Sequence, residues 1–155
     1  MFYLLQVQPL KNILIHCGGK HQSGEVVITR FGMEGNAIYA LSMEIQQQLQ
    51  SDNKAIIHLD LKPSLSLAEI EQRIQKASKQ KMTDILKNTI KLRPTVVQLI
   101  KTQLTKEQFL DPQQLAALLK RLPLTVVETA PLDEAISTTG GIALEAIDAN
   151  YQLKA

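Results

Sequence analysis

Apolar and polar residues change their spacing twice along the chain, and these changes predict three kinds of segment in succession. Residues 4–16 and 24–31 are rich in β-branched and long apolar residues, which favours two extended strands. Pro9 interrupts any helix in the first segment and suits an edge or bulged strand. Gly18 and Gly19 supply the positive φ angles of a tight turn, so a β-hairpin is predicted.

The apolar spacing becomes helical after this hairpin. A helix is predicted from residue 36, with Asn36 as its N-cap, because apolar residues then fall three or four positions apart. These residues are Ile38, Leu41, Ile45 and Leu49. Residues 55–61 follow as a short aliphatic run, which predicts another strand.

Residues 62–121 keep a helical pattern and predict four short amphipathic helices. Ser66 is followed three residues later by glutamate, the spacing of a capping box that opens the first helix. Residues 82–92 form the second, Pro94 occupies the first turn of the third, and Asp111 opens the fourth.

The last third of the chain returns to β composition. Residues 124–130 predict a strand, and residues 142–148 alternate apolar and acidic residues. The order of strands, helices and strands predicts an α+β fold in which a small β-barrel-like subdomain, residues 1–61 and 122–155, is interrupted by a helical subdomain, residues 62–121. Neither part has enough apolar surface to be very stable alone, so we expect the two to pack together.

The overall composition is that of a soluble globular protein, with 45% hydrophobic and 21% charged residues. No apolar run approaches the roughly 18 residues needed to cross a bilayer, and the first residues lack the features of a signal peptide. The single cysteine, Cys17, excludes an internal disulfide and fits a reducing compartment. We therefore expect a cytoplasmic protein.

Charge is divided unevenly along the chain. Residues 62–121 contain 12 Lys and Arg against 5 Asp and Glu, a balance of +7, whereas the other residues contain 5 against 10, a balance of −5. A basic surface of this size can attract phosphate or nucleic acid. Lysines on solvated helix faces give the same count, and that explanation is the commoner one.

The first predicted hairpin contains residue types that can bind a metal or act as a nucleophile. His16, Cys17 and His21 are close in sequence, but a zinc site usually needs two separated pairs of ligands, and His58 is the one other histidine. No base is recognisable near Cys17, so it is not predicted to be a nucleophile. Polar residues at a turn are the favoured interpretation, and no metal site is predicted.

No pair of carboxylates is predicted to act as a catalytic acid and base. Asp133 and Glu134 are adjacent, and side chains of adjacent residues point apart. Asp133 follows Pro131 closely and is interpreted as the cap of a short helix.

The sequence GMEG places Gly32 and Gly35 between a strand and a helix, a geometry in which main-chain N–H groups can meet an anion. The complete dinucleotide fingerprint and the Walker A loop are both absent from the sequence, and a GxxG turn alone is more often a steric device. A nucleic-acid clamp of GXXG type joins two helices, whereas here a strand comes first. The helical part also has one aromatic residue for stacking, Phe109.

Four stretches of the chain together resemble a known family. GEVVITRFGMEGNAIYALS, AIIHLDLKPSLS, LAALLKRLPL and PLDEAISTTGGIALEAID are similar to the inserted middle region of the bacterial BaiN-like flavoproteins, FAD-dependent oxidoreductases, and in particular to a subgroup of uncharacterised flavoproteins. The family pattern of Thr, then GxxG, is matched by Thr29, Gly32 and Gly35. A later family pattern, E-A-x-x-T-x-G-G-V, is matched by Glu134, Ala135, Thr138, Gly140 and Gly141, with Ile142 in place of valine.

The resemblance implies a small β-barrel joined to a bundle of helix-two-turns-helix type, which covers the flavin in the complete enzyme. The residues that it places toward the cofactor or substrate are Thr29, Arg30, Gly32, Gly35, Thr138, Gly140 and Gly141. Many relatives have histidine where this chain has Arg30, so the role of that histidine does not transfer. Arg30 is expected either to contact an anionic group or to lie exposed at the end of a strand.

The resemblance also implies that further segments complete the enzyme. The family's glycine-rich fingerprint and its closing segment are not found within these residues, so the chain is expected to be an excised or truncated insert domain that is inactive alone. FAD, a flanking Rossmann-like FAD domain of the same polypeptide and NAD(P)H are the implied cofactors and partners. The alternatives are a nucleic-acid-binding module that uses the basic helices, and an interaction scaffold with no small-molecule site.

Overall fold

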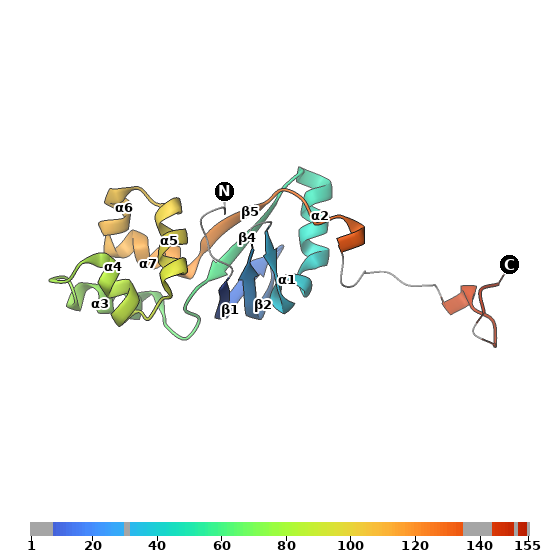
Figure 1. Cartoon of the computed structure of the whole chain (residues 1–155), viewed down its shortest axis with the longest axis horizontal. Helices are drawn as coiled ribbons and strands as arrows, with labels where there is room; N and C mark the ends of the chain where they lie inside the picture. Colours follow the sequence, from blue (N-terminus) through green and yellow to red (C-terminus); the bar gives the residue numbers. More distant parts are fainter. Residues whose placement is uncertain (1–7, 30–31, 135–143, 151, 155) are drawn as a thin grey trace.

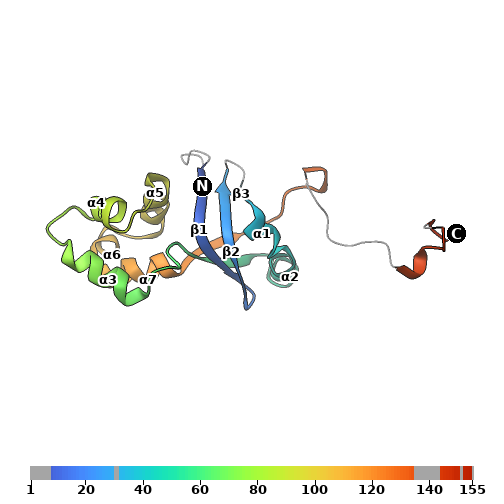
Figure 2. The ribbon, with the colours of Figure 1, turned by 90° about the horizontal axis from the view of Figure 1, so that it is seen from below.

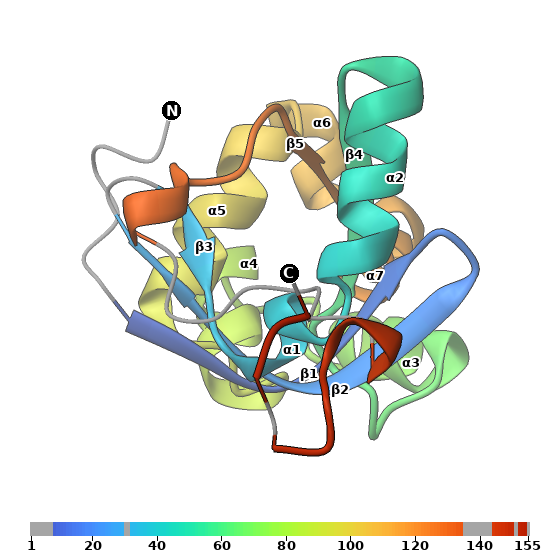
Figure 3. The same ribbon diagram turned by 90° about the vertical axis from the view of Figure 1, so that its right-hand side faces the viewer.

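A computed structural model describes residues 8–29, 32–134, 144–150 and 152–154, and it has an α+β architecture (Figure 1). In this part of the chain, five antiparallel strands form one sheet in the order β3-β2-β1-β4-β5. The sheet curls into half of a barrel (Figure 3). The strands are β1 (Gln8–Cys17), β2 (Lys20–Ile28), β3 (Met33–Glu34), β4 (Ala55–Asp60) and β5 (Leu122–Val126).

The described residues also contain seven α-helices. Helices α1 and α2 lie beside the sheet, and α3 to α7 gather at the other end of the molecule (Figures 1 and 2). They are α1 (Asn36–Tyr39), α2 (Ser42–Asp52), α3 (Leu67–Lys76), α4 (Met82–Asp84), α5 (Pro94–Gln103), α6 (Lys106–Leu110) and α7 (Pro112–Lys120). A π-helical turn, η1 (Ile85–Thr89), and two 3₁₀ turns, η2 (Leu132–Glu134) and η3 (Leu144–Ala146), complete the set.

The first two strands form the predicted hairpin. Gly18 and Gly19 have φ angles of 54° and 84°, which two-residue turns between twisted strands require. The register of β1 on β2 shifts between Leu10 and Ile13, and Asn12 adopts a φ of 55° within this bulge. A bulge bends a strand, so β1 can serve both β2 and β4 in a curled sheet.

The helices α3 to α7 are inserted in the sequence between β4 and β5, and these two strands are neighbours in the sheet. Leu59 of β4 pairs with Leu122 of β5, and the Leu61 N–H donates to the Leu119 carbonyl at 2.9 Å. The predicted strand over 124–130 therefore begins two residues earlier and ends at Val126. Pro123 is tolerated because, in the described sheet, β5 is an edge strand.

The helix predicted from residue 36 is two helices, and the predicted N-cap is wrong. Gly35, with φ of 122°, occupies the N-cap position of α1, and the Asn36 side chain instead accepts a bond from the Glu25 N–H at 3.4 Å. The break between α1 and α2 puts Leu41 in the core with 2% of its surface exposed. Ile45, four residues later in α2, is also buried, so the apolar spacing continues across this break.

Residues 62–121 form the helices and caps that their sequence predicts, except at two places. The capping box at Ser66, Pro94 in the first turn of α5 and the Asp111 cap of α7 are all confirmed. The segment predicted as one helix over 82–92 is one α-turn followed by η1, which lets Ile85, Leu86 and Ile90 all face the core. Helix α6, with its capping box at Thr105, was not predicted.

One hydrophobic cluster runs from the sheet into the helices. Leu10 and Ile13 of β1 belong to the same buried cluster as Leu61, Leu92 and Val96. The expected packing of the two parts is therefore present in the described residues. Of the segment 142–148, the described residues form η3, a 3₁₀ turn over Leu144–Ala146, and Ile147 makes an isolated antiparallel bridge with Leu153.

Candidate functional site

The GMEG segment forms a tight hairpin before it reaches a helix. The Thr29 N–H donates to the Gly32 carbonyl at 2.8 Å, and the Gly32 N–H donates to the Thr29 hydroxyl at 3.2 Å. Met33 and Glu34 then pair with the end of β2 as the short strand β3. The expected direct passage from strand to helix is thus wrong, because β3 comes between them.

Gly35 is required by the packing of the chain on itself. A β-carbon placed at Gly35 would lie 2.7 Å from the Glu25 carbonyl oxygen and 3.3 Å from Val26 Cα. A β-carbon at Gly24 would lie 2.8 Å from the Asn36 side-chain oxygen. Gly24 and Gly35 therefore let β2 and the start of α1 approach each other closely, and of the two GMEG glycines Gly35 has this steric role.

Gly32 differs from Gly35 in what surrounds it. No atom lies within 4 Å of a β-carbon placed at Gly32, and its φ is outside the left-handed region. Helix α1 has four residues, too few to make its N-terminus an anion site on its own. Of the two glycines of GMEG, Gly32 is therefore the one with open space beside it.

The second glycine segment cannot be placed beside the first. Arg30, Thr138, Gly140 and Gly141 lie outside the described residues. The described chain before that segment ends at η2, where the Glu134 N–H donates to the Pro131 carbonyl at 3.0 Å. Asp133 is the middle residue of this 3₁₀ turn and does not occupy its predicted cap position.

Comparison with known families identifies this arrangement. A family model described as "HI0933-like protein barrel and H2TH domain" matches residues 5–137. The chain belongs to the HI0933-like flavoprotein family. This is the BaiN/HI0933-like family that the sequence resembles, and its barrel and H2TH parts agree with the curled sheet and helices described above. A search of curated proteins found no match.

The described helices of this HI0933-like domain include none that is both long and apolar enough to cross a bilayer. The family match also covers the turn of Thr29, Gly32 and Gly35, all of which fall within residues 5–137.

Strand pairing in the HI0933-like sheet brings three histidines into one row. His16 is the register partner of both His21 and His58, and the His16 and His21 rings are 5.8 Å apart. Burial lowers the pKa of His58, and the positive charges of Arg121 and His16 lower it further. Sequence spacing could not reveal this row, because it depends on the pairing of β1 with β4. Among the described residues, no group of three or more His, Cys, Asp and Glu side chains is placed to hold a metal ion.

Cys17 follows His16 and so points to the opposite, buried face of the sheet. The Gln48 amide donates to its sulfur at 3.3 Å. Burial raises the pKa of the Cys17 thiol, and the negative charge of Glu44 adds to this effect. A buried neutral thiol is a poor nucleophile, so its chemistry does not define a site.

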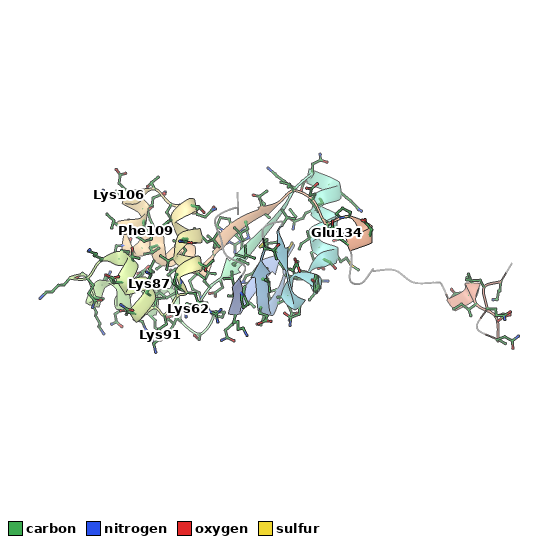
Figure 4. The ribbon with its side chains drawn as sticks, viewed as in Figure 1. Lys62, Lys87, Lys91, Lys106, Phe109 and Glu134 are labelled. Carbon is green, nitrogen blue, oxygen red and sulfur yellow. The ribbon has the colours of Figure 1, made fainter. Side chains whose placement is uncertain are left out.

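Phe109, the aromatic considered for nucleic-acid stacking, is buried in the HI0933-like helical region. Its side chain is 9% exposed, and the Lys101 ammonium lies 5.4 Å from the ring centroid. Figure 4 shows Phe109 within the group of helices. A base therefore has no open ring face to stack on at this residue. The one aromatic residue of the helical part is thus not available for stacking, which weakens the nucleic-acid alternative.

Proposed function

We propose that the chain is the barrel-and-H2TH insert of an FAD-dependent oxidoreductase, that it covers the flavin and substrate side of the complete enzyme, and that it performs no chemistry alone. The family match over residues 5–137 is the observation that supports this proposal. FAD supplies the redox chemistry in such an enzyme. The role of this chain is then to shape the pocket and limit the access of water.

The GMEG turn supplies the described residues of the proposed cofactor site. We propose that Gly32 gives the closest main-chain approach, because the space around it is open, and that Gly35 acts through the packing of β2 on α1. Thr29 holds the turn through its bonds with Gly32. The other proposed contacts with cofactor or substrate are Arg30, Thr138, Gly140 and Gly141.

The proposed partners are a Rossmann-like FAD domain, encoded on either side of these residues in one cytoplasmic polypeptide, and NAD(P)H. We also propose that residues 1–61 with 122–155, and residues 62–121, are its two structural units. The pairing of Leu59 with Leu122 supports this division, because the helical region both begins and ends at this pair.

The first test reads the natural coding sequence on both sides of these residues. A glycine-rich dinucleotide fingerprint before them and a closing flavin-binding segment after them are expected. Neighbouring coding sequence without either feature would refute the proposal.

The second test measures flavin in the complete polypeptide. We expect Gly32→Leu to lower the flavin that remains bound after gel filtration, because the new side chain fills the space left for the cofactor. Gln72→Leu, at an exposed position of α3, is the matched control and should retain flavin. Equal retention and turnover in both variants would contradict the role given to Gly32.

A further inference from the structure

We propose that a hollow between the bulge of β1 and the start of α5 binds the phosphate end of a small anion. This basic hollow has a volume of about 190 Å³. Its floor includes the buried side chains of Leu10, Ile13 and Leu92. The inference concerns residues outside the GMEG turn and does not rest on the proposed flavin function.

Positive charge gathers around the basic hollow from three separate segments. Lys11 comes from the β1 bulge, Lys62 from the segment after β4, and Lys91 and Arg93 from the segment before α5. No aspartate or glutamate is among its lining residues. An anion that enters the basic hollow would therefore meet cations from several directions.

Three of these cations have no acidic partner in the described part of the chain. The ion pairs found there join Lys11 to Glu25, Lys20 to Glu44 and Lys120 to Asp60, so they leave out Lys62, Lys91 and Arg93. Burial lowers the pKa of Lys62, and the charges of Lys91 and Arg73 lower it further. Like charges held this close are stabilised when an anion binds between them.

Hydrogen bonds hold two of the cationic groups in place. The Lys62 ammonium donates to the Lys91 carbonyl at 3.1 Å, and the Arg93 guanidinium donates to the Pro9 carbonyl at 3.0 Å. Figure 4 shows Lys62 and Lys91 near each other at the lower edge of the helical region. These bonds tie β1, the segment after β4 and the segment before α5 together around the basic hollow, so the charged groups of Lys62 and Arg93 are arranged before any ligand arrives.

The backbone around the basic hollow is locally strained. In the described residues, left-handed φ angles at non-glycine positions occur at Asn12, Asn53 and Lys91, with values of 55°, 56° and 59°. Asn12 and Lys91 both line the basic hollow. Residues with such strained backbone angles persist where the surrounding structure holds them, and they are found often at ligand-binding sites.

The first turn of α5 adds to the positive electrostatic potential in the basic hollow. This helix has ten residues and begins at Pro94, and among the described residues its N-cap, Arg93, makes no side-chain capping bond. Val96 of the first turn lines the basic hollow. The positive end of the helix dipole therefore acts on the same space as Lys62, Lys91 and Arg93.

The size of the basic hollow limits its ligand. At about 30 Å³ for each water, it has room for about six waters, which suits one or two phosphate groups. A second hollow of about 530 Å³ shares Lys11, Asn12 and Ile13 with it. Free pyrophosphate and the diphosphate of a nucleotide thus present the same chemistry to the cations, and the second hollow offers space for the rest of a nucleotide.

Calorimetric titration of the chain with pyrophosphate tests the proposal. We expect saturable binding that Lys91→Gln weakens by about tenfold, because one charge-assisted contact is lost. Lys87→Gln is the matched control, since it removes the same charge from an exposed position of η1 outside the basic hollow, and it should change affinity by about twofold or less. Amide resonances of residues 10–13 and 91–96 should shift on titration of the unsubstituted chain.

A parallel titration with ADP distinguishes the two sources of phosphate. Tighter binding of ADP than of pyrophosphate supports a nucleotide, and equal affinities support the free anion. No saturable binding of either probe would overturn the proposal, as would equal loss of affinity in the Lys87 and Lys91 variants. Binding of duplex DNA alone, with neither small anion bound, would overturn it in favour of nucleic acid.

Discussion

The ammonium of Lys120, at the end of α7, lies 2.5 Å from a carboxylate oxygen of Asp60, at the end of β4. The same ammonium donates to the carbonyls of Lys62 and Leu65, at 3.1 Å and 2.7 Å. The other Asp60 oxygen accepts the Lys62 N–H at 2.9 Å. One lysine therefore joins the sheet, the segment after β4 and the last turn of the helical region.

Breaking this ion pair should destabilise the whole chain. Lys120→Met leaves the Asp60 carboxylate, 8% exposed, without its cation, and we expect the free energy of unfolding to fall by about 3 kcal/mol. Urea unfolding followed by circular dichroism measures this change. Adding Asp60→Asn to Lys120→Met should recover part of the loss, because no charge is then left buried. Lys11→Met, which breaks the exposed pair with Glu25, should cost about 1 kcal/mol or less.

The two glycines of GMEG should respond differently to a new side chain. In the chain alone, Gly35→Val forces a β-carbon against the Glu25 carbonyl at a φ of 122°, and we expect a loss of about 3 kcal/mol in unfolding free energy. Gly32→Ala meets open space and should change it by about 0.5 kcal/mol or less. Similar unfolding midpoints for the two variants would show that the close packing of β2 on α1 does not require Gly35.

Acid should weaken the helical region through its caps. The bonds from the Ser66 N–H and hydroxyl hold the pKa of Glu69 below its usual value, and the Gln114 side chain and nearby backbone N–H groups do the same for Asp111. Because both carboxyls have lower pKa values when folded, their contribution is complete above their ordinary pKa values and is lost as pH falls through the folded ones.

Urea midpoints measured from about pH 6 down to about pH 3 check this dependence. Glu69→Gln keeps an acceptor at the capping box but removes its titration, so its curve should be flatter than that of the unsubstituted chain. An identical pH dependence in both proteins would exclude Glu69 as a contributor.

The Cys17 thiol should react slowly in the folded chain. Burial raises the pKa of Cys17, and Glu44 raises it further, so little thiolate forms at neutral pH and reagents cannot reach it. Alkylation by iodoacetamide, followed by mass spectrometry, should be much slower in buffer than in strong urea. Equal rates in the two solutions would show that β1 opens readily at this position.

The sequence correctly predicted the turn and the helix caps that depend on residues close together in the chain. The Gly18–Gly19 turn and the caps at Ser66 and Asp111 each depend on residues a few positions apart, so the sequence shows them directly. The break after α1 was missed because the helical spacing of Leu41 and Ile45 continues across it. Short β3 was missed for a similar reason, since its two residues gain their strand character from pairing with β2.

The candidate sites were harder to predict than the elements. The resemblance of GMEG to a family motif identified the turn, but the different surroundings of Gly32 and Gly35 follow from how α1 packs on β2. The basic hollow joins Lys11 to Arg93, which are far apart in sequence, through the crossing from β4 into the helices. The tertiary structure brings these residues together, and no local sequence pattern predicts that they meet.

The pairing of Leu59 with Leu122 also has a kinetic consequence. If β4 and β5 had to find each other across an unfolded segment of residues 62–121, closing that long loop would cost conformational entropy before any strand bond formed. The helices shorten this search, because α7 returns the chain to Leu61 through the Leu119 carbonyl. Early assembly of the helices therefore speeds the completion of the sheet, and substitutions that slow their formation should delay the strand pairing that follows.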